Sequence, residues 1–212
     1  METEHNKPYE FHGLELRPAG SQWKTTCPFC DKPKLYISKK TGQYNCKACS
    51  KSGNKFTFLT EYYKSIPSSL RERRKISEIR GIPVSIVGRQ DLKFSESGEV
   101  LIPINNPDKK NLVNLRKWSP QTKKAYNTPG CCSLYFLKWE TEGPIYICEG
   151  EWDAMALGAL MERAKWSKID QASIVAVPGA NIFKDTWLPY FKDRQVCLIS
   201  VSYTHLTLPT KA

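Results

Sequence analysis

Four cysteines in the first quarter of the chain have the spacing of a metal site. They form two Cys-x2-Cys pairs separated by 15 residues, and the four are Cys27, Cys30, Cys46 and Cys49. Two such pairs can place four thiolates on a tetrahedron, which is the arrangement that Zn²⁺ prefers in structural sites. Because the protein fills all four positions and no histidine lies at either pair, we predict one structural zinc ion that takes no part in catalysis.

Two disulfides, or unrelated thiols, are the alternative interpretation of these cysteines. The N-terminus METEHNKPYE lacks the basic-then-apolar order of a signal peptide, so we expect an intracellular protein whose thiols stay reduced. The sequence contains no apolar run of about 18 residues, which is the length that a membrane-spanning helix needs. The segment between the cysteine pairs predicts short strands at 35–38 and 43–45 around a Thr-Gly turn, which gives a zinc ribbon.

The charge of the chain favours a polyanionic partner. Thirty-two Lys and Arg residues against 21 Asp and Glu residues give a formal charge of +11. Within the predicted ribbon, lysines and tyrosines alternate in a way that suits single-stranded nucleic acid. They are Lys34, Tyr36, Lys39, Lys40, Tyr44 and Lys47. The alternative is that the tyrosines pack the ribbon and that the lysines only keep it soluble.

A second candidate site follows the apolar run IYIC at 145–148. Glu149 comes directly after this predicted strand, Gly150 permits a tight turn, and Asp153 falls in the first turn of a predicted helix. In an open parallel sheet, ligands gather at the carboxyl ends of the strands, and carboxylates there suit Mg²⁺. Alternatively, Glu149 is a solvated strand-end residue and Asp153 is an acid that favours the helix N-terminus.

The rest of the chain alternates between predicted strands and helices. We predict a helix after Asn54, which is the expected cap, and residues 65–75 have the composition of a linker. A further helix is predicted to end at Gly81, and another to begin at Pro83. Strands are predicted at 100–104, 111–118, 145–148, 173–177 and 195–200, and helices at 152–165 and about 184–192. Strand–helix alternation in the C-terminal part predicts an α/β fold with a mostly parallel sheet.

Several segments resemble a known family. The stretch EGEWDAMA at 149–156 resembles the first signature of Toprim domains, which occur in DNA primases, topoisomerases and some nucleases. A zinc ribbon ahead of that signature is similar to bacterial and bacteriophage primases, and the four-cysteine set is closer to the bacteriophage primase–helicase type. Further similar segments are GNKFTFLTEYY at 53–63, RGIPVSIVGRQDLKF at 80–94, KKAYNTPG at 123–130 and VAVPGAN at 175–181.

The resemblance implies an activity and a set of site residues. Primases make short RNA primers on single-stranded DNA from ribonucleoside triphosphates, by Mg²⁺-dependent nucleotidyl transfer, in the cytoplasm of a bacterial or phage-infected cell. Glu149, Asp153 and Lys124 would be catalytic, with Mg²⁺ held by the two carboxylates. Arg116, Lys123 and Asn127 would bind the nucleotide. Because Arg116 and Lys117 are adjacent on a strand, only one of them can face the site.

The resemblance also predicts domains and a partner. We expect a ribbon with its helix at 1–63, a linker and the start of a polymerase domain at 64–142, and an incomplete Toprim domain at 143–200. A replicative helicase, in the same chain or separate, is an expected partner. The family's second acidic pair should follow Ser200, where this chain has Val201 and Tyr203, so we interpret 201–212 as a non-native tail.

Two other functions remain open from the sequence. One is a zinc-dependent module that binds single-stranded nucleic acid without catalysis, since half of the expected acidic site is absent. The other is a Toprim nuclease or topoisomerase-like protein, which the zinc ribbon upstream disfavours.

Overall fold

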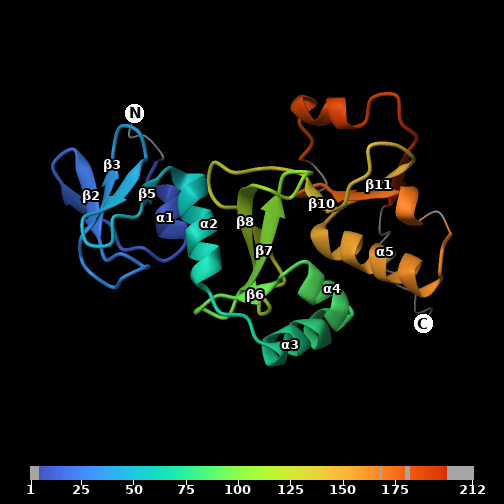
Figure 1. Ribbon diagram of the computed structural model, residues 1–212, viewed down its shortest axis with the longest axis horizontal. Helices are drawn as coiled ribbons and strands as arrows, with labels where there is room; N and C mark the ends of the chain where they lie inside the picture. Colours follow the sequence, from blue (N-terminus) through green and yellow to red (C-terminus); the bar gives the residue numbers. More distant parts are fainter. Residues whose placement is uncertain (1–4, 168, 180–181, 200–212) are drawn as a thin grey trace, which may run out of the picture.

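The computed structural model describes residues 5–167, 169–179 and 182–199. The chain forms three β-sheets that follow one another along its length (Figure 1). The first belongs to the zinc ribbon, the second lies in the middle of the molecule, and the third is covered by helices on both faces. The predicted α/β fold with an N-terminal four-cysteine zinc ribbon is therefore confirmed.

The first sheet is an antiparallel meander of five short strands. The strands are β1 (Arg17–Ala19), β2 (Gln22–Thr25), β3 (Leu35–Ser38), β4 (Tyr44–Cys46) and β5 (Ser52–Gly53), with α1 (Lys7–Phe11) before them and α2 (Lys55–Ser65) after them. The strand predicted at 35–38 is β3. The predicted cap is also confirmed, because Asn54 Oδ1 accepts hydrogen bonds from the backbone N–H groups of Phe56 at 2.9 Å and Thr57 at 3.1 Å.

Helix α2 joins the ribbon to the second sheet. Its Phe58 and Leu59 are fully buried, and they share one hydrophobic cluster with Tyr44 of the ribbon and with Leu101 and Leu115 of the second sheet. The ribbon therefore packs against the molecule through an apolar core, because burying these side chains removes their surfaces from water.

The second sheet follows two helices and is antiparallel throughout. It contains β6 (Lys93–Phe94), β7 (Val100–Asn105), β8 (Leu112–Trp118) and β9 (Ala125–Tyr126), preceded by α3 (Leu70–Arg80) and α4 (Val84–Arg89). Helix α3 begins inside the predicted linker, which corrects that interpretation. Ser69 and Glu72 form a capping box that starts the helix there. Gly81 ends α3 in the left-handed conformation, as predicted.

The third sheet has the predicted parallel core. Its strand order is β10 (Tyr135–Lys138), β12 (Ser173–Ala176), β11 (Ile145–Cys148) and β13 (Val196–Ile199). Strand β11 lies between β12 and β13 and is parallel to both, whereas β10 is an antiparallel edge strand. Strand β10 precedes the predicted domain boundary at residue 143. The third sheet therefore includes one strand that the prediction assigned to the preceding domain.

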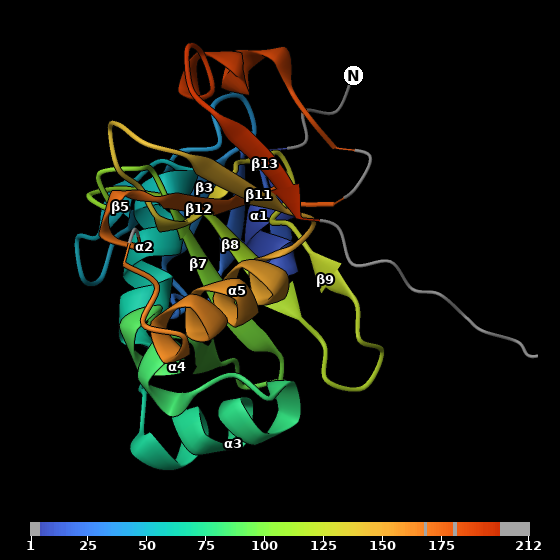
Figure 2. The same ribbon diagram turned by 90° about the vertical axis from the view of Figure 1, so that its right-hand side faces the viewer.

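Helices cover both faces of the third sheet (Figure 2). Helix α5 (Glu151–Arg163) packs Ala154 and Met155 against one face. The helix predicted at about 184–192 is the 3-10 helix η2 (Asp185–Tyr190), which places Trp187 against the other face. A short 3-10 turn, η1 (Ile169–Gln171), precedes β12. Within the described residues, no helix is long and apolar enough to cross a membrane.

Candidate functional site

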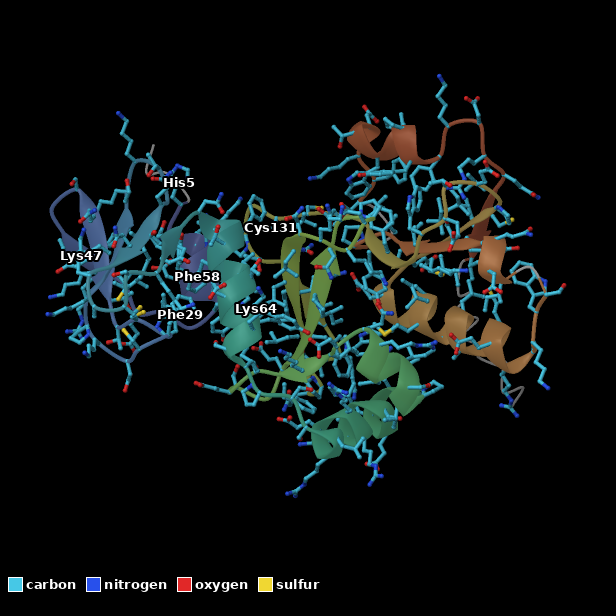
Figure 3. All side chains as sticks on the ribbon, viewed as in Figure 1. His5, Phe29, Lys47, Phe58, Lys64 and Cys131 are labelled. Atoms are coloured by element: carbon cyan, nitrogen blue, oxygen red, sulfur yellow. The ribbon has the colours of Figure 1, made fainter. Side chains whose placement is uncertain are left out.

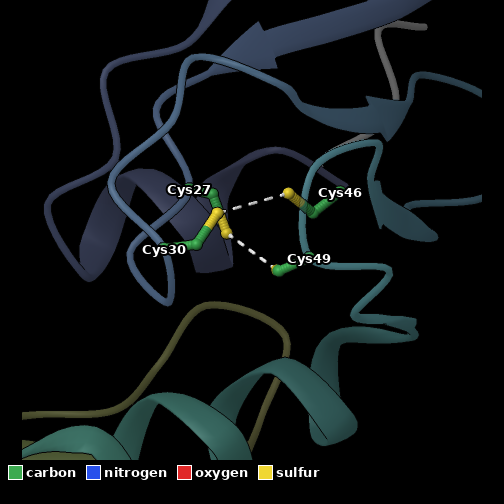
Figure 4. A group of neighbouring side chains, drawn as sticks. All are labelled: Cys27, Cys30, Cys46 and Cys49. Atoms are coloured by element: carbon green, nitrogen blue, oxygen red, sulfur yellow. Dashed lines mark hydrogen bonds between the residues drawn. The ribbon is translucent and has the colours of Figure 1, made fainter.

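The four cysteines of the ribbon converge on one point (Figure 4). Their sulfur atoms all lie within 4.8 Å of one another, with Cys27 and Cys49 at 3.9 Å and Cys30 and Cys46 at 3.7 Å. A tetrahedral zinc ion with Zn–S bonds of about 2.3 Å requires sulfur atoms about 3.8 Å apart. All four thiols are free, so the disulfide alternative does not hold. The four residues form a zinc-binding site made of cysteines alone.

Two similar turns present these thiols. Asp31 N–H donates to Cys27 O at 2.9 Å and Ser50 N–H donates to Cys46 O at 3.0 Å, and both Asp31 and Ser50 have left-handed backbones. Burial raises the pKa of the Cys27 thiol to about 12. Burial also acts against ionisation of Cys46, but backbone N–H groups near its sulfur lower that pKa to about 7. A bound dication would supply the charge that keeps all four thiols ionised.

The ribbon packs one face and exposes the other. On the packed face, Tyr44 is 2% exposed and meets Phe58 edge to face with ring centroids 5.8 Å apart, so for Tyr44 the packing alternative holds. Phe29 and Phe58, which Figure 3 labels where the ribbon meets α2, lie 5.9 Å apart. On the outer face, strand register aligns Arg17, Lys24 and Tyr36 in one row, with the Lys24 ammonium 6.0 Å from the centre of the Tyr36 ring. The predicted cation–aromatic surface therefore depends on Tyr36 and not on Tyr44.

Glu149 lies at the predicted place, directly after the central strand of the parallel sheet. The carboxyl ends of β11, β12 and β13 share this edge, so Glu149 is close to the loop that follows β12. Asp153 follows one turn later on α5. Burial raises the pKa of Asp153, Arg80 opposes the rise, and the charge of Glu149 adds to it. Two neighbouring carboxylates that repel each other are a place where a hard divalent cation would be stabilised.

The residues around this acidic pair come from all parts of the chain after the ribbon. The Arg80 guanidinium lies 4.9 Å from the ring centre of Trp118 and 4.6 Å from that of Trp152. The Lys123 ammonium lies 5.4 Å from the ring centre of Trp118. The two indole rings meet edge to face at 5.3 Å and form, with these cations, a cationic indole platform beside Asp153. Sequence reasoning missed Arg80, whose only signal was that it opens the segment RGIPV.

Arg116 and Lys117 point to opposite faces of β8, as predicted. Arg116, whose side chain is 6% exposed, forms an ion pair with buried Glu151 and donates to Pro178 O at 3.1 Å. It therefore ties the start of α5 and the loop after β12 to the second sheet. Lys117 instead pairs with Glu99 at 3.1 Å on the ribbon side. Sequence reasoning missed Glu151, and a nucleotide role for Arg116 stays a prediction.

The remaining predicted nucleotide residues lie in and after the turn between β8 and β9. Lys123 and Lys124 are exposed in this turn, where Lys123 N–H donates to Ser119 O at 2.9 Å. Asn127 follows β9, and its Oδ1 accepts a hydrogen bond of 2.7 Å from Asn114 Nδ2 on β8. The structure thus brings Lys123 next to the acidic edge through Trp118 and leaves Lys124 open to solvent. Val201 and Tyr203, where the second acidic pair was expected, lie outside the described residues.

A comparison with known protein families finds a match over the ribbon. Residues 11–79 match the family model described as the CHC2 zinc finger. Similar solved structures include the zinc-binding and RNA polymerase domains of Aquifex aeolicus primase, with 16% identity, a TM-score of 0.44, and coverage of 94% of this chain and 72% of that one. The primase fragment of the bacteriophage T7 primase–helicase protein has 18% identity, a TM-score of 0.46, and coverage of 82% and 77%. No curated protein sequence matches this chain. Over residues 11–79, the chain is therefore similar to the CHC2 zinc finger, and its four cysteines form a zinc-binding site there.

Proposed function

We propose that this chain is the zinc-ribbon and catalytic part of a DNA primase, which makes short RNA primers on single-stranded DNA. The observation that carries the proposal is the combination, in one chain, of a CHC2-type ribbon with Glu149 and Asp153 at the carboxyl edge of a parallel sheet. The two carboxylates would bind a divalent cation, and the neighbouring Lys and Arg side chains would bind the phosphate groups of the substrate.

The proposed reaction joins two ribonucleotides. The 3′-hydroxyl of one loses its proton to solvent and its oxygen forms a bond to the α-phosphorus of the other, while the bond from that phosphorus to the β-phosphate oxygen breaks and pyrophosphate leaves. Mg²⁺, held by Glu149 and Asp153, would polarise the attacked phosphate and offset the charge that develops. The protein mainly positions groups. Lys123, which is part of the cationic indole platform, and the adjacent Lys124 lie on an exposed turn and are assigned to the triphosphate.

The outer row of the ribbon is assigned to the single-stranded template. Lys24 over the Tyr36 ring combines a base-stacking surface with a positive charge, as proteins that bind single strands commonly do. Arg17 and Lys24 also line a hollow of about 740 Å³ that reaches Tyr62 of α2, and we assign this hollow to the continuation of the strand. A replicative helicase is the proposed protein partner, and the cytoplasm of a bacterial or phage-infected cell is the proposed location.

Substitution of the strand-edge glutamate tests the proposal. Glu149→Gln keeps the size of the side chain and removes its charge, so we expect primer synthesis from ribonucleotides with Mg²⁺ on single-stranded DNA to fall by at least a hundredfold. Zinc content and single-strand binding should not change, because the ribbon lies in a different sheet. Glu142→Gln, on the exposed loop before β11, is the matched control. Full synthesis by Glu149→Gln would overturn the assignment.

A second function, binding of single-stranded nucleic acid without catalysis, is favoured by one observation. Among the described residues, a group of three or more potential metal ligands occurs only at the four cysteines, so the acidic edge has only two carboxylates there. Single-strand binding by the wild-type chain with no primer synthesis under any divalent cation would support this second function. Strand breaks in place of labelled RNA would instead support a nuclease.

A further inference from the structure

A buried histidine links the N-terminal region to the segment that carries Asn127. His12 is the C-cap residue of α1 and is 4% exposed, and its ring lies between those of Phe11 and Tyr62 with centroids 5.0 and 5.1 Å away. Its Nε2 lies 2.8 Å from the hydroxyl of Thr128, a residue 116 positions later in the chain. Thr128 is fully buried as well. This contact is a buried polar link between the segment after α1 and the segment after β9.

The direction of the hydrogen bonds fixes the tautomer of His12. The Thr128 hydroxyl has one proton, and Leu115 O, at 2.7 Å, can only accept. The hydroxyl therefore donates to Leu115 and accepts from His12, so the ring proton of His12 is on Nε2. Burial, assisted by the nearby charge of Lys117, lowers the pKa of His12 to about 3, which keeps the ring neutral at any physiological pH.

The chain of hydrogen bonds continues to the predicted nucleotide residue. Thr128 N–H donates to Asn114 Oδ1 at 3.2 Å, which leaves Asn114 Nδ2 to donate to Asn127 Oδ1 at 2.7 Å. The oxygen of the Asn127 amide is therefore engaged within the protein, while its Nδ2 has no partner among the described residues. Two N–H donors held in one orientation suit the phosphate or ribose oxygens of a nucleotide.

We propose that His12 is a positioning residue of the nucleotide site. Its Nε2–H holds Thr128, Thr128 and Asn114 hold Asn127, and Asn127 presents its amide N–H groups to a ribonucleoside triphosphate. This proposal rests on the function proposed above. According to this proposal, a residue beside the zinc ribbon affects nucleotide affinity without changing zinc binding or template binding.

The expected effects follow from the loss of one buried hydrogen bond. His12→Phe keeps an aromatic ring next to Phe11 and Tyr62 and removes both ring nitrogens, and with them the Nε2–H that reaches Thr128. We expect the KM for ribonucleotides to rise roughly 5- to 30-fold with little change in kcat, because an interrupted buried network loses the orientation of its last member. His12→Gln supplies an amide N–H near the Nε2 position and should restore KM to within about threefold of the wild-type value. Zinc content and single-strand affinity should be the same in both variants.

A second pair of variants and a second measurement keep the test independent of primer synthesis. Thr128→Val removes the hydroxyl and keeps the shape, whereas Thr128→Ser keeps the hydroxyl. Amide hydrogen exchange at residues 125–131 should become faster in His12→Phe and Thr128→Val and remain near the wild-type rate in His12→Gln and Thr128→Ser. If His12→Phe does not fold, the Thr128 pair carries the test alone.

The outcomes separate this proposal from the function on which it rests. Faster amide exchange in His12→Phe and Thr128→Val, together with no primer synthesis by the wild type, would contradict the proposed function. It would still support the link between His12 and the Asn127 segment. Unchanged exchange and unchanged KM in His12→Phe and Thr128→Val would overturn the positioning role. An equal rise of KM in His12→Phe and His12→Gln would also overturn it, since ring packing and not the N–H would then be responsible.

Discussion

The zinc ribbon and the acidic edge differ in how the chain assembles them. The four zinc ligands lie within residues 27–49 and are presented by two similar turns of a single antiparallel sheet. The acidic edge instead takes Arg80 from α3, Trp118 from the second sheet, Glu149 from the end of β11 and Asp153 from α5. The first site is local in sequence and closed, and the second is assembled from distant segments and open on the solvent side.

The difference indicates what each site contributes. A closed site of four cysteines has no free position for a substrate, so its metal can only stabilise the ribbon and the surface that the ribbon displays. The acidic edge depends on how the second and third sheets are held together, and the buried Arg116–Glu151 ion pair lies at that junction. Stability in the N-terminal region therefore depends on the metal, and geometry at the edge depends on packing and on one ion pair.

Removal of zinc should have the largest effect of any single change. Cys27 and Cys46 are fully buried in the same cluster as Tyr44 and Phe58, so we expect Cys27→Ser to unfold the ribbon and loosen the contact with α2. Structural zinc supplies about 10–16 kcal/mol in small zinc modules. Metal analysis should show a loss of one zinc ion per chain, and amide exchange should be fast over residues 17–53.

Cys197→Ser is the control, because Cys197 lies on β13 and is not among the zinc ligands. This variant should keep its zinc and the exchange pattern of the ribbon. A folded ribbon in metal-free Cys27→Ser would contradict the view that this region depends on its metal.

Loss of the buried ion pair should come next in size. Arg116→Met leaves the Glu151 carboxylate buried without its partner, which typically costs about 3–5 kcal/mol. We expect the loss in thermal and urea unfolding, together with weaker binding of Mg²⁺ at the edge, while the zinc content stays the same. The double variant Arg116→Met/Glu151→Gln removes both charges and should recover at least half of the lost stability. No recovery in the double variant would show that Arg116 acts mainly through Pro178 or through packing.

The same contrast explains which features the sequence allowed us to predict. Strand β3, the Asn54 cap, the Gly81 helix end and the position of Glu149 each depend on patterns within a few residues, and all were predicted. The parallel sheet was predicted because strands and helices alternate with their usual lengths. The start of α3 was missed because the Ser69–Glu72 capping box lies in a stretch whose Pro, Ser and charge content is typical of a linker.

Features that depend on distant contacts were not predictable. Arg80 and Trp118 are 38 positions apart, and no periodicity in either segment indicates that they meet. Glu151 is adjacent to a strand-edge motif, and only its pairing with Arg116 from another sheet separates it from an ordinary helix-start acid. Tyr44 could have been placed only by knowing which face of the ribbon meets α2, and that choice depends on Phe58.

Substitution on the outer face of the ribbon should have a smaller effect, on binding and not on stability. Tyr36→Ala removes a half-buried ring from the row that includes Lys24, and a stacked base typically contributes about 1–3 kcal/mol. We therefore expect a loss of single-strand affinity of roughly 5- to 150-fold, measured by fluorescence anisotropy at fixed salt, with zinc content unchanged. Tyr126→Ala, which removes an exposed ring from β9, is the matched control and should leave this affinity near the wild-type value. Equal losses in both variants would contradict a binding role that is specific to the ribbon.

The smallest effect is expected at the acidic edge, where the negative charge of Asp153 lowers the stability of the fold. The pKa of Asp153 is raised because burial and Glu149 outweigh Arg80 and the α5 N-terminus, so the folded state holds the proton more tightly than the unfolded state. Above the ordinary aspartate pKa, ionised Asp153 therefore reduces stability, and the cost is complete once the pH exceeds the raised pKa. Asp153→Asn should raise the Tm at pH 7 by no more than about 2–4 °C, because Asp153 is partly exposed and solvent screens the charge. The gain in Tm should vanish as the pH falls below about 3.8, where Asp153 is protonated in both the folded and the unfolded state.

Added Mg²⁺ should raise the Tm of the wild type and not that of Asp153→Asn. If the variant is less stable than the wild type at pH 7 without Mg²⁺, then Asp153 stabilises the N-terminus of α5 and is not part of a cation site.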